Sequence, residues 1–254
     1  HKQTADEGER VSFKSEFSDQ GINDIHTFIW NFGDGNLDTS FSNLIDHTYE
    51  DNNTYEIELI IFDDALDSDT LKSEITIQNV APKIKAVIPE RGDEGTPISL
   101  SLVIYDEGMN DTHSISWDLG DGNKDSTMEF THQYIDDGKY TINISVEDDD
   151  GGKDSWKQEI NIMNVNPVVE LSIPGSAFEG DTLIFNANVT DLGLNDKFTY
   201  LWNFGNGKQD TLKNSSNIYT DNGNFTVYIT VKDDDGGVST SKRDIIIENV
   251  PPTL

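Results

Sequence analysis

One six-residue motif occurs three times in this chain and constrains its fold more than any other feature. It opens with a tryptophan and closes on a glycine, and it begins at Trp30, Trp117 and Trp202. The copies are 87 and 85 residues apart. A tyrosine, an Asn-Val-x-Pro string and an Asp-x-Gly-x-Asn-Asp loop recur in the same order. This period exceeds that of a solenoid repeat and suits a small domain with its own core.

The repeat divides the 254 residues into three domains and a remainder. We predict repeat one at 1–80, repeat two at 81–165 and repeat three at 166–250, with 251–254 as the start of a following repeat. Repeat one has no counterpart of residues 83–87, so we predict that it lacks its first strand. We interpret the sequence as a segment of a longer array.

Alternating hydrophobicity predicts β-strands throughout. Tyr140, Ile142, Ile144 and Val146 are separated by polar residues, and repeats one and three share this alternation. Such a period of two, with turn residues at regular spacing and no helical periodicity, predicts an all-β sandwich of about seven strands per repeat. For repeat two we predict one short unplaced strand and strands at residues 83–88, 97–104, 114–119, 124–130, 139–147 and 154–163.

Charge and composition exclude several function classes. The net charge is −31, with only 17 lysines and arginines, so neither nucleic acid nor an anionic membrane surface is an expected partner. The chain has no cysteine, and no apolar stretch is long enough for direct membrane insertion. No serine lies on a nucleophile elbow, and the five histidines form no ligand pair. We therefore predict no catalytic residue and no enzyme.

The recurring hairpin resembles a known family. Trp-x-Phe-Gly-Asp-Gly at Trp30, the His-x-Tyr strings at His47 and His132, and the Gly-x-Tyr strand that follows are similar to those of the polycystic-kidney-disease (PKD) domain. Repeats two and three depart mildly from this pattern, with Leu119 for Phe and Asn206 for Asp. The resemblance implies three tandem immunoglobulin-like sandwiches in an elongated rod. It also implies an extracellular or cell-surface location and a non-catalytic role.

Acidic loops recur at one end of each predicted sandwich. The loop between the second and third long strands, the loop between the last two strands and the Asn-Val-x-Pro linker should converge there, against the Glu-Gly turn of the preceding repeat. Oxygen ligands without His or Cys suit a hard cation, and Ca²⁺ accepts six to eight oxygens in adaptable geometry. We therefore predict Ca²⁺ at each joint. The predicted ligands are Asn79, Asp106, Asp111, Asp148, Asp149 and Glu7 at the first joint, and Asn164, Asp191, Asp196, Asp233, Asp234 and Glu94 at the second.

The resemblance implies a narrower ligand set. In collagenase-type modules, calcium is held by a linker asparagine and the acids of the second-to-third strand loop, which favours Asn164, Asp191 and Asp196. Repeat one keeps acids at Asp19, Asp24, Asp63 and Asp64 but has no linker asparagine, so its site should be partial. The alternative interpretation is that these Asp, Asn and Gly residues simply form solvated turns.

Asn-x-Ser/Thr sequons give candidate glycosylation sites. Asn143 and Asn188 fall on predicted outward strand positions, whereas the sequon at Asn110 lies inside the predicted metal loop. Including the first two, the candidates are Asn52, Asn143, Asn188, Asn214 and Asn224.

Three near-identical domains in a row favour a structural or adhesive function. We predict a calcium-stabilised stalk or lattice segment, as in surface-layer proteins and adhesins, with neighbouring repeats or other copies as partners. The alternative is an accessory module that holds a polysaccharide or a protein for a secreted enzyme. A third hypothesis is a filament subunit that assembles by strand donation, because an open edge at repeat one would pair with another chain.

Overall fold

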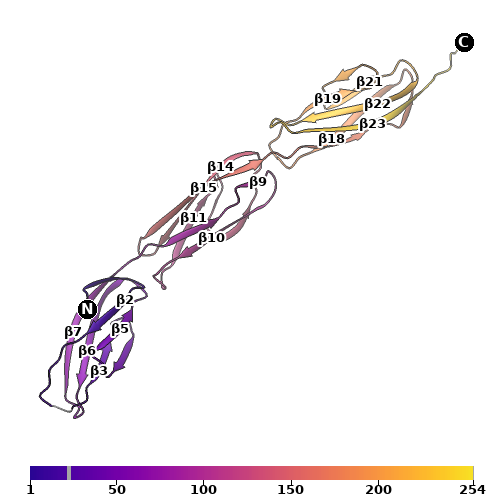
Figure 1. The fold of residues 1–254 in the computed structure, drawn as a ribbon. Coiled ribbons are helices and arrows are strands. Elements are labelled where there is room, and N and C mark those ends of the chain that lie inside the picture. Colours follow the sequence, from indigo (N-terminus) through magenta and orange to yellow (C-terminus); the bar gives the residue numbers. More distant parts are fainter. Residues whose placement is uncertain (22–23, 254) are drawn as a thin grey trace.

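A computed structural model describes residues 1–21 and 24–253. Every regular element in this part of the chain is a β-strand, and the strands form three sandwiches that follow one another along the sequence (Figure 1). The predicted fold class is therefore confirmed, whereas the elongated rod stays a prediction. Ile22 and Asn23 of the first acidic loop, and Leu254 of the predicted following repeat, lie outside the described residues. Among the described residues there is no helix with the length and hydropathy needed to cross a bilayer.

Repeat two shows the complete architecture. One sheet has the order β12-β11-β14-β15-β9 and the other has the order β13-β10-β8. All neighbours are antiparallel except β9, which pairs in parallel with the end of β15. The strands are β8 (Lys83–Val87), β9 (Arg91–Asp93), β10 (Ile98–Tyr105), β11 (His113–Asp118), β12 (Lys124–Asp125), β13 (Glu129–His132), β14 (Gly138–Asp148) and β15 (Lys153–Met163).

Repeat three has the same two sheets. Their orders are β17-β23-β22-β19-β20 and β16-β18-β21, and β17 again pairs in parallel with the last long strand. The strands are β16 (Val168–Ser172), β17 (Ser176–Phe178), β18 (Thr182–Thr190), β19 (Thr199–Asn203), β20 (Gln209–Asp210), β21 (Asn214–Ile218), β22 (Gly223–Lys232) and β23 (Val238–Glu248).

Repeat one differs in its smaller sheet. The larger sheet has the order β1-β7-β6-β3-β4, but the smaller sheet contains only β2 and β5 among the described strands, and no described strand takes the place that β8 has beside β10 in repeat two. The strands are β1 (Thr4–Asp6), β2 (Arg10–Lys14), β3 (Thr27–Asn31), β4 (Leu37–Ser40), β5 (Leu44–Thr48), β6 (Asn53–Phe62) and β7 (Ser68–Gln78).

Each sandwich closes around a buried tryptophan on its third long strand. Trp117 and Trp202 are fully buried, and Trp30 is 4% exposed. The alternation that predicted β14 is confirmed, because Ile142, Ile144 and Val146 are all buried. A buried tyrosine then fixes the hairpin after the tryptophan: the Tyr134 hydroxyl donates to the Leu119 carbonyl over 3.0 Å. The same bond recurs in repeats one and three.

The predicted strand at 124–130 is wrong in one respect. It is divided into β12 and β13, because Asp125 accepts hydrogen bonds from the backbone and hydroxyl of Thr127 and so forms a tight turn. This turn also presents the Thr127 carbonyl to the Trp117 indole N–H at 3.0 Å. The interruption therefore satisfies the polar atom of the core tryptophan.

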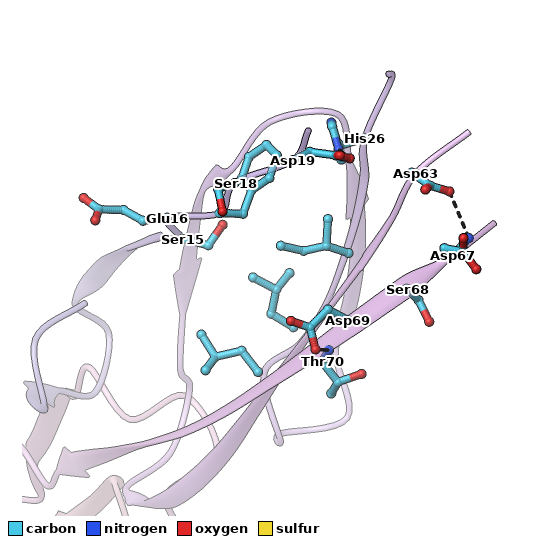
Figure 2. A pocket seen from close by; sticks show the side chains of 14 residues that line it. Ser15, Glu16, Ser18, Asp19, His26, Asp63, Asp67, Ser68, Asp69 and Thr70 are labelled. Atoms are coloured by element: carbon cyan, nitrogen blue, oxygen red, sulfur yellow. Dashed lines mark hydrogen bonds and ion pairs between the residues drawn. The ribbon is translucent and has the colours of Figure 1, made fainter. Parts of the chain in front are cut away.

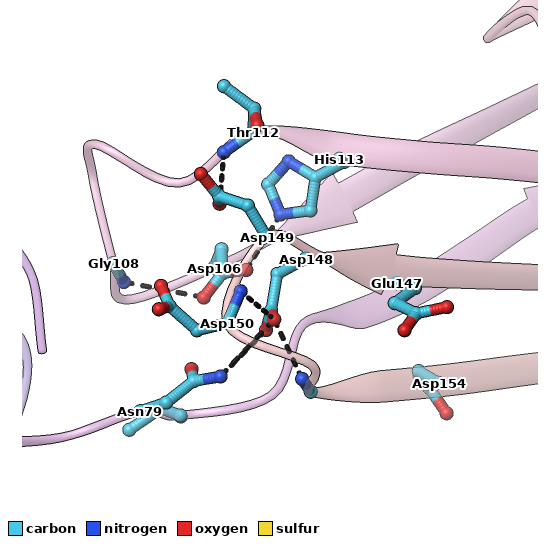
Figure 3. A network of polar contacts seen from close by, with 12 residues as sticks. Asn79, Asp106, Gly108, Thr112, His113, Glu147, Asp148, Asp149, Asp150 and Asp154 are labelled. Atoms are coloured by element: carbon cyan, nitrogen blue, oxygen red, sulfur yellow. Dashed lines mark hydrogen bonds and ion pairs between the residues drawn. The ribbon is translucent and has the colours of Figure 1, made fainter.

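The sheet connections place the acidic segments at the joints. In repeat two, the β10–β11 and β14–β15 loops lie at the end that faces repeat one, where the linker enters (Figures 1 and 3). The β9–β10 turn and the β13–β14 turn lie at the opposite end. Each joint is therefore formed by two loops and a linker from one repeat and by two turns from the repeat before it.

Candidate metal centre

Three carboxylates from two repeats meet at each joint. Glu7 follows β1 of repeat one, and it faces Asp106 and Asp111 in the β10–β11 loop of repeat two. One oxygen of each lies within 4.8 Å of an oxygen of the other two. At the second joint the same arrangement is formed by Glu94, Asp191 and Asp196. The structure therefore brings together three of the six predicted ligands at each joint.

The glutamate at each joint is held by the linker backbone. Glu7 is 1% exposed and Glu94 is 0% exposed. One oxygen of Glu7 accepts the backbone N–H of Val80 over 2.6 Å, and one oxygen of Glu94 accepts that of Val165 over 2.7 Å. This bond fixes the carboxylate, so that its second oxygen faces the acids of the next repeat. A glutamate of one repeat thus joins the group of carboxylates formed by the acidic loop of the following repeat.

The linker asparagine is oriented by an aspartate of the β14–β15 loop. The Asn79 amide nitrogen donates to both oxygens of Asp148, at 3.2 and 3.1 Å, and the Asn164 amide nitrogen donates to Asp233 at 3.1 Å (Figure 3). Because the nitrogen is used in this way, the amide oxygen points elsewhere. It is buried without a hydrogen-bond partner in both asparagines.

Unpartnered oxygens are concentrated at the two joints. Within the described part of the chain, eleven buried side-chain polar atoms have no hydrogen-bond partner, and eight of them are joint oxygens. A buried acceptor left without a donor costs about 1–3 kcal/mol, and more when it is charged. All eight atoms are acceptors, three at the first joint and five at the second, so they could be satisfied by cations bound at the two joints. They belong to Glu7, Asn79, Asp111, Glu94, Asn164, Asp191 and Asp196, the last of which contributes both of its oxygens.

Two acids of each Asp-Asp-Asp loop accept backbone N–H groups, and their role as calcium ligands stays a prediction. One oxygen of Asp148 accepts the backbone N–H groups of Asp150 and Gly152, at 3.0 and 2.7 Å, and Asp233 binds the equivalent loop in the same way. Asp149 accepts the Thr112 N–H at 2.9 Å, and Asp234 accepts the Lys197 N–H at 2.7 Å. These four predicted ligands are therefore directed mainly at N–H donors, and they shape the loop and position the asparagine.

Burial and mutual repulsion raise the pKa values of the central acids. Burial, with the nearby Asp106 and Asp150 charges, raises the pKa of Asp111 to about 6. Burial raises the pKa of Glu7 to about 7 against the opposing Val80 hydrogen bond, and the Asp111 charge adds to this rise. Burial and the Glu94 charge raise the pKa of Asp196 to about 7. Each raised pKa means that, without a cation, ionisation of the group is less favourable at the joint than in water.

The residues present fit a calcium ion. Oxygen ligands lie about 2.3–2.6 Å from Ca²⁺, so two ligands on opposite sides of the ion are roughly 5 Å apart. The 4.8 Å limit on the oxygen separations at the joints agrees with this geometry. Glu, Asp and Asn oxygens from a turn, a loop and a linker form an irregular set, which Ca²⁺ accepts more readily than the strictly octahedral Mg²⁺.

Repeat one has an acidic group of its own. Asp19, Asp24 and Asp63 each place an oxygen within 4.8 Å of the others. The nearby pocket, shown in Figure 2, is lined by Asp69 and by apolar residues of β6 and β7. In repeat two the equivalent of Asp69 is Asp154, which accepts the Ile84 N–H of β8 at 2.9 Å. The pocket therefore lies where the first strand packs in repeat two, and its lining is explained without a small ligand.

One turn acid at each joint was missed by the sequence analysis. Asp51 lies in the β5–β6 turn and Asp136 in the β13–β14 turn, and each approaches the acids of the next repeat. Asp51, Asp136 and Asp221 are spaced by 85 residues. That spacing was the available signal, but a turn aspartate is otherwise ordinary.

The predicted glycosylation sites stay predictions. Their side chains are accessible except at Asn52, which is half-buried; those of Asn143, Asn188, Asn214 and Asn224 are exposed.

Backbone contacts also join the repeats. A Cβ atom placed on Gly95 would lie 2.3 Å from the Leu192 carbonyl oxygen, and one on Gly8 would lie 2.9 Å from Cβ of Glu107. At the second joint the Leu194 N–H also donates to the Ile135 carbonyl over 3.0 Å. Gly8 and Gly95, the glycines of the first two Glu-Gly turns, are therefore required by the close approach of the next repeat as well as by their positive φ.

Comparison with known proteins identifies one domain family along the chain. The PKD domain matches residues 1–78, 79–163 and 164–247. Collagenase ColA of Bacillus cereus is 30% identical over 86 residues, which are 34% of this chain and 9% of the collagenase. The pre-pro-metalloprotease PrtV of Vibrio cholerae is 27% identical over 168 residues, 66% of this chain and 18% of the protease. The chain thus spans less than a fifth of either relative.

Two solved structures of single domains are similar to parts of this chain. The PKD1 domain of Vibrio anguillarum Epp is 28% identical, with a TM-score of 0.30, and its whole length matches 35% of this chain. The PKD1 domain of the Vibrio cholerae metalloprotease PrtV is also 28% identical, with a TM-score of 0.29; 99% of it matches 33% of this chain.

Proposed function

The chain consists of three consecutive domains of the PKD family, and on this premise we propose that it is a non-catalytic accessory segment of a secreted enzyme. We propose further that calcium holds its repeats together. The relatives support the accessory function over the surface-lattice stalk, because they are a collagenase and a metalloprotease that contain similar segments. An extracellular location follows from the same proposal. PKD domains are non-catalytic modules, so any reaction would belong to other parts of the whole protein.

One observation carries the calcium part of the proposal. Eight buried oxygens without hydrogen-bond partners gather at the two joints, and they come from residues on both sides of each joint. A cation bound there would neutralise the acids and connect the two repeats. Without it, charges only a few ångströms apart repel each other across the joint. We therefore propose that calcium sets the stiffness of the segment.

Small-angle scattering and thermal unfolding test this function. We expect the maximum dimension to be well defined in millimolar Ca²⁺, and the distance distribution to broaden when excess EDTA is added. The melting temperature should fall at the same time, because a ligand that binds only the folded state stabilises it. If EDTA leaves both the scattering profile and the melting temperature unchanged, calcium does not stiffen the joints.

A further inference from the structure

Each joint contains a second group of carboxylates beside the first. Asp51, Asp111 and Asp150 each place an oxygen within 4.8 Å of the others, and Asp136, Asp196 and Asp235 do the same at the second joint. Both groups have the same origin: a turn of the preceding repeat, the β10–β11 or β18–β19 loop, and the last acid of the Asp-Asp-Asp loop. The arrangement therefore recurs with the repeat.

One aspartate at each joint belongs to both groups. Asp196 belongs to the group with Glu94 and Asp191 and also to the group with Asp136 and Asp235, and Asp111 likewise belongs to both groups at the first joint. Both oxygens of Asp196 are buried without a hydrogen-bond partner. Glu94, which is 0% exposed, also directs an unpartnered oxygen into the joint. Asp111 has one such oxygen. A carboxylate that belongs to two groups of acids and has oxygens without hydrogen-bond partners is suited to act as a bridging ligand.

The charges at the joint also exceed what one ion can balance. The two groups together contain five carboxylates at each joint, and no lysine or arginine is paired with any of them among the described residues. One divalent cation would leave a local charge of −3 when all five are ionised, and two would leave −1. Because the attraction between opposite charges strengthens as water is excluded, the second ion would bind in the field of the remaining acids.

We propose that each joint binds two calcium ions, which share Asp111 at the first joint and Asp196 at the second. The second ion is held by the turn acid of the preceding repeat, Asp51 or Asp136, together with the shared aspartate and Asp150 or Asp235. This inference rests on the proposed function, because it places the second ion beside the first. Its consequence is that two separate elements of the preceding repeat, the Glu-Gly turn and the acidic turn, are tied to the next repeat.

The test compares the number of ions bound by two variants. In the first, Asp51→Asn and Asp136→Asn are combined, which removes the charge of both turn acids without changing their size. The control is Asp221→Asn, the equivalent turn acid of repeat three, which is not part of either group. Bound Ca²⁺ is counted by equilibrium dialysis followed by atomic emission, and far-ultraviolet circular dichroism confirms that both variants fold.

We expect the double variant to bind two fewer Ca²⁺ per chain than the unmodified protein, and the control to bind the same number. Equal binding by the double variant and the unmodified protein would overturn the second ion while leaving the proposed function intact. No binding by the unmodified protein would overturn both. An equal loss in the control would also overturn the proposal, because the effect would not depend on the joint.

Terbium luminescence supplies an independent measurement. Tb³⁺ has ligand preferences similar to those of Ca²⁺, and two lanthanides that share one carboxylate lie close enough for efficient Tb³⁺-to-Eu³⁺ energy transfer. We expect strong transfer in protein loaded with a mixture of the two ions, and at least a several-fold reduction in the double variant. Transfer of the same efficiency in the double variant would contradict a shared ligand.

Discussion

The far ends of repeats two and three have the same local structure but different surroundings. In both, a Glu-Gly turn has a glycine with positive φ, 65° at Gly95 and 87° at Gly180. The N–H of each glycine donates over 2.8 Å to the carbonyl of the core tyrosine. The glutamate of each turn accepts a valine N–H from the outgoing linker, at 2.7 Å for Glu94 and 2.9 Å for Glu179. The turn is therefore formed by its own repeat.

The two ends differ in what lies against them. Glu94 is completely buried, whereas Glu179 is not. A Cβ atom on Gly95 would collide with the Leu192 carbonyl, but one on Gly180 would meet no other described atom within 4 Å. The comparison teaches that each repeat forms its half of a joint in advance, and that contact with a following repeat buries a glutamate that is otherwise half-buried.

Removal of calcium should have the largest effect, and it should affect the Glu-Gly turn of repeat two much more than that of repeat three. At a free Ca²⁺ concentration 100 times its dissociation constant, each bound ion stabilises the folded state by about 2.7 kcal/mol. We expect EDTA to abolish that contribution at the joints and to accelerate amide hydrogen exchange around Glu94. Exchange around Glu179 should change little. Equal acceleration at both turns would mean that the ion is not held by the joint.

Matched glycine substitutions should give the next largest difference. Gly180→Ala should cost about 1–2 kcal/mol, the usual penalty for a left-handed conformation in a residue other than glycine. Gly95→Ala should cost the same and also push repeat three away through the Leu192 contact. We expect calcium affinity at the second joint to fall about tenfold or more in Gly95→Ala only, measured by titration calorimetry. A matching loss in Gly180→Ala would show that the turn, not the contact, controls the affinity.

Substitution of the joint glutamate should weaken calcium binding when calcium is present and should stabilise the fold when calcium is removed. With calcium present, Glu94→Gln should lower the affinity of the second joint by about tenfold, or about 1.4 kcal/mol. In EDTA it should raise the melting temperature, because it removes a buried charge that has no counter-ion. Glu179→Gln serves as the control and should change neither quantity appreciably. A lower melting temperature of Glu94→Gln in EDTA would contradict this account of the joint.

A further predicted effect is a pH dependence of the calcium-free protein. Glu7 and Asp196 have pKa values near 7 in the folded state, above their ordinary values of 4.5 and 3.8. The folded state therefore keeps protons that the unfolded state releases. The contribution of these two groups to the free energy of unfolding should be most favourable below about pH 4, and it should fall as the pH rises from about 4 to about 7.

Denaturant midpoints measured in EDTA across this range test the dependence. Glu7→Gln should flatten the profile, because the amide does not titrate. A profile that rises between pH 4 and 7 and is insensitive to Glu7→Gln would show that other groups dominate.

The fold was largely predictable from local pattern. The three tryptophan hairpins and the alternation of residues 140–146 depend on neighbours in sequence, and the structure confirms them. The division of 124–130 was missed, because it depends on a hydrogen bond between Asp125 and Thr127 that the hydrophobic pattern does not record. The short strand left unplaced is β9, which consists of only three residues and pairs with β15 from far along the chain.

The candidate site was less predictable than the fold. The linker asparagines and the acids of the second-to-third strand loops were identified because they recur, and the structure brings them to the joints. The sequence could not show that Asp148 and Asp233 are used by backbone N–H donors, since that depends on the loop conformation. It also could not show that Asp51 and Asp136 reach the next repeat, because this requires the relative placement of two domains.

The parallel pairing of β9 with β15 has a consequence for mechanical load. In repeat two the chain enters at one end through β8 and β9 and leaves at the other end from β15. Tension on the chain would therefore pull the paired strands β9 and β15 in opposite directions along their length. Hydrogen bonds that lie across the direction of pull must break together rather than one at a time. A segment of such repeats would therefore resist stretching through its terminal strands, while its joints determine how readily it bends.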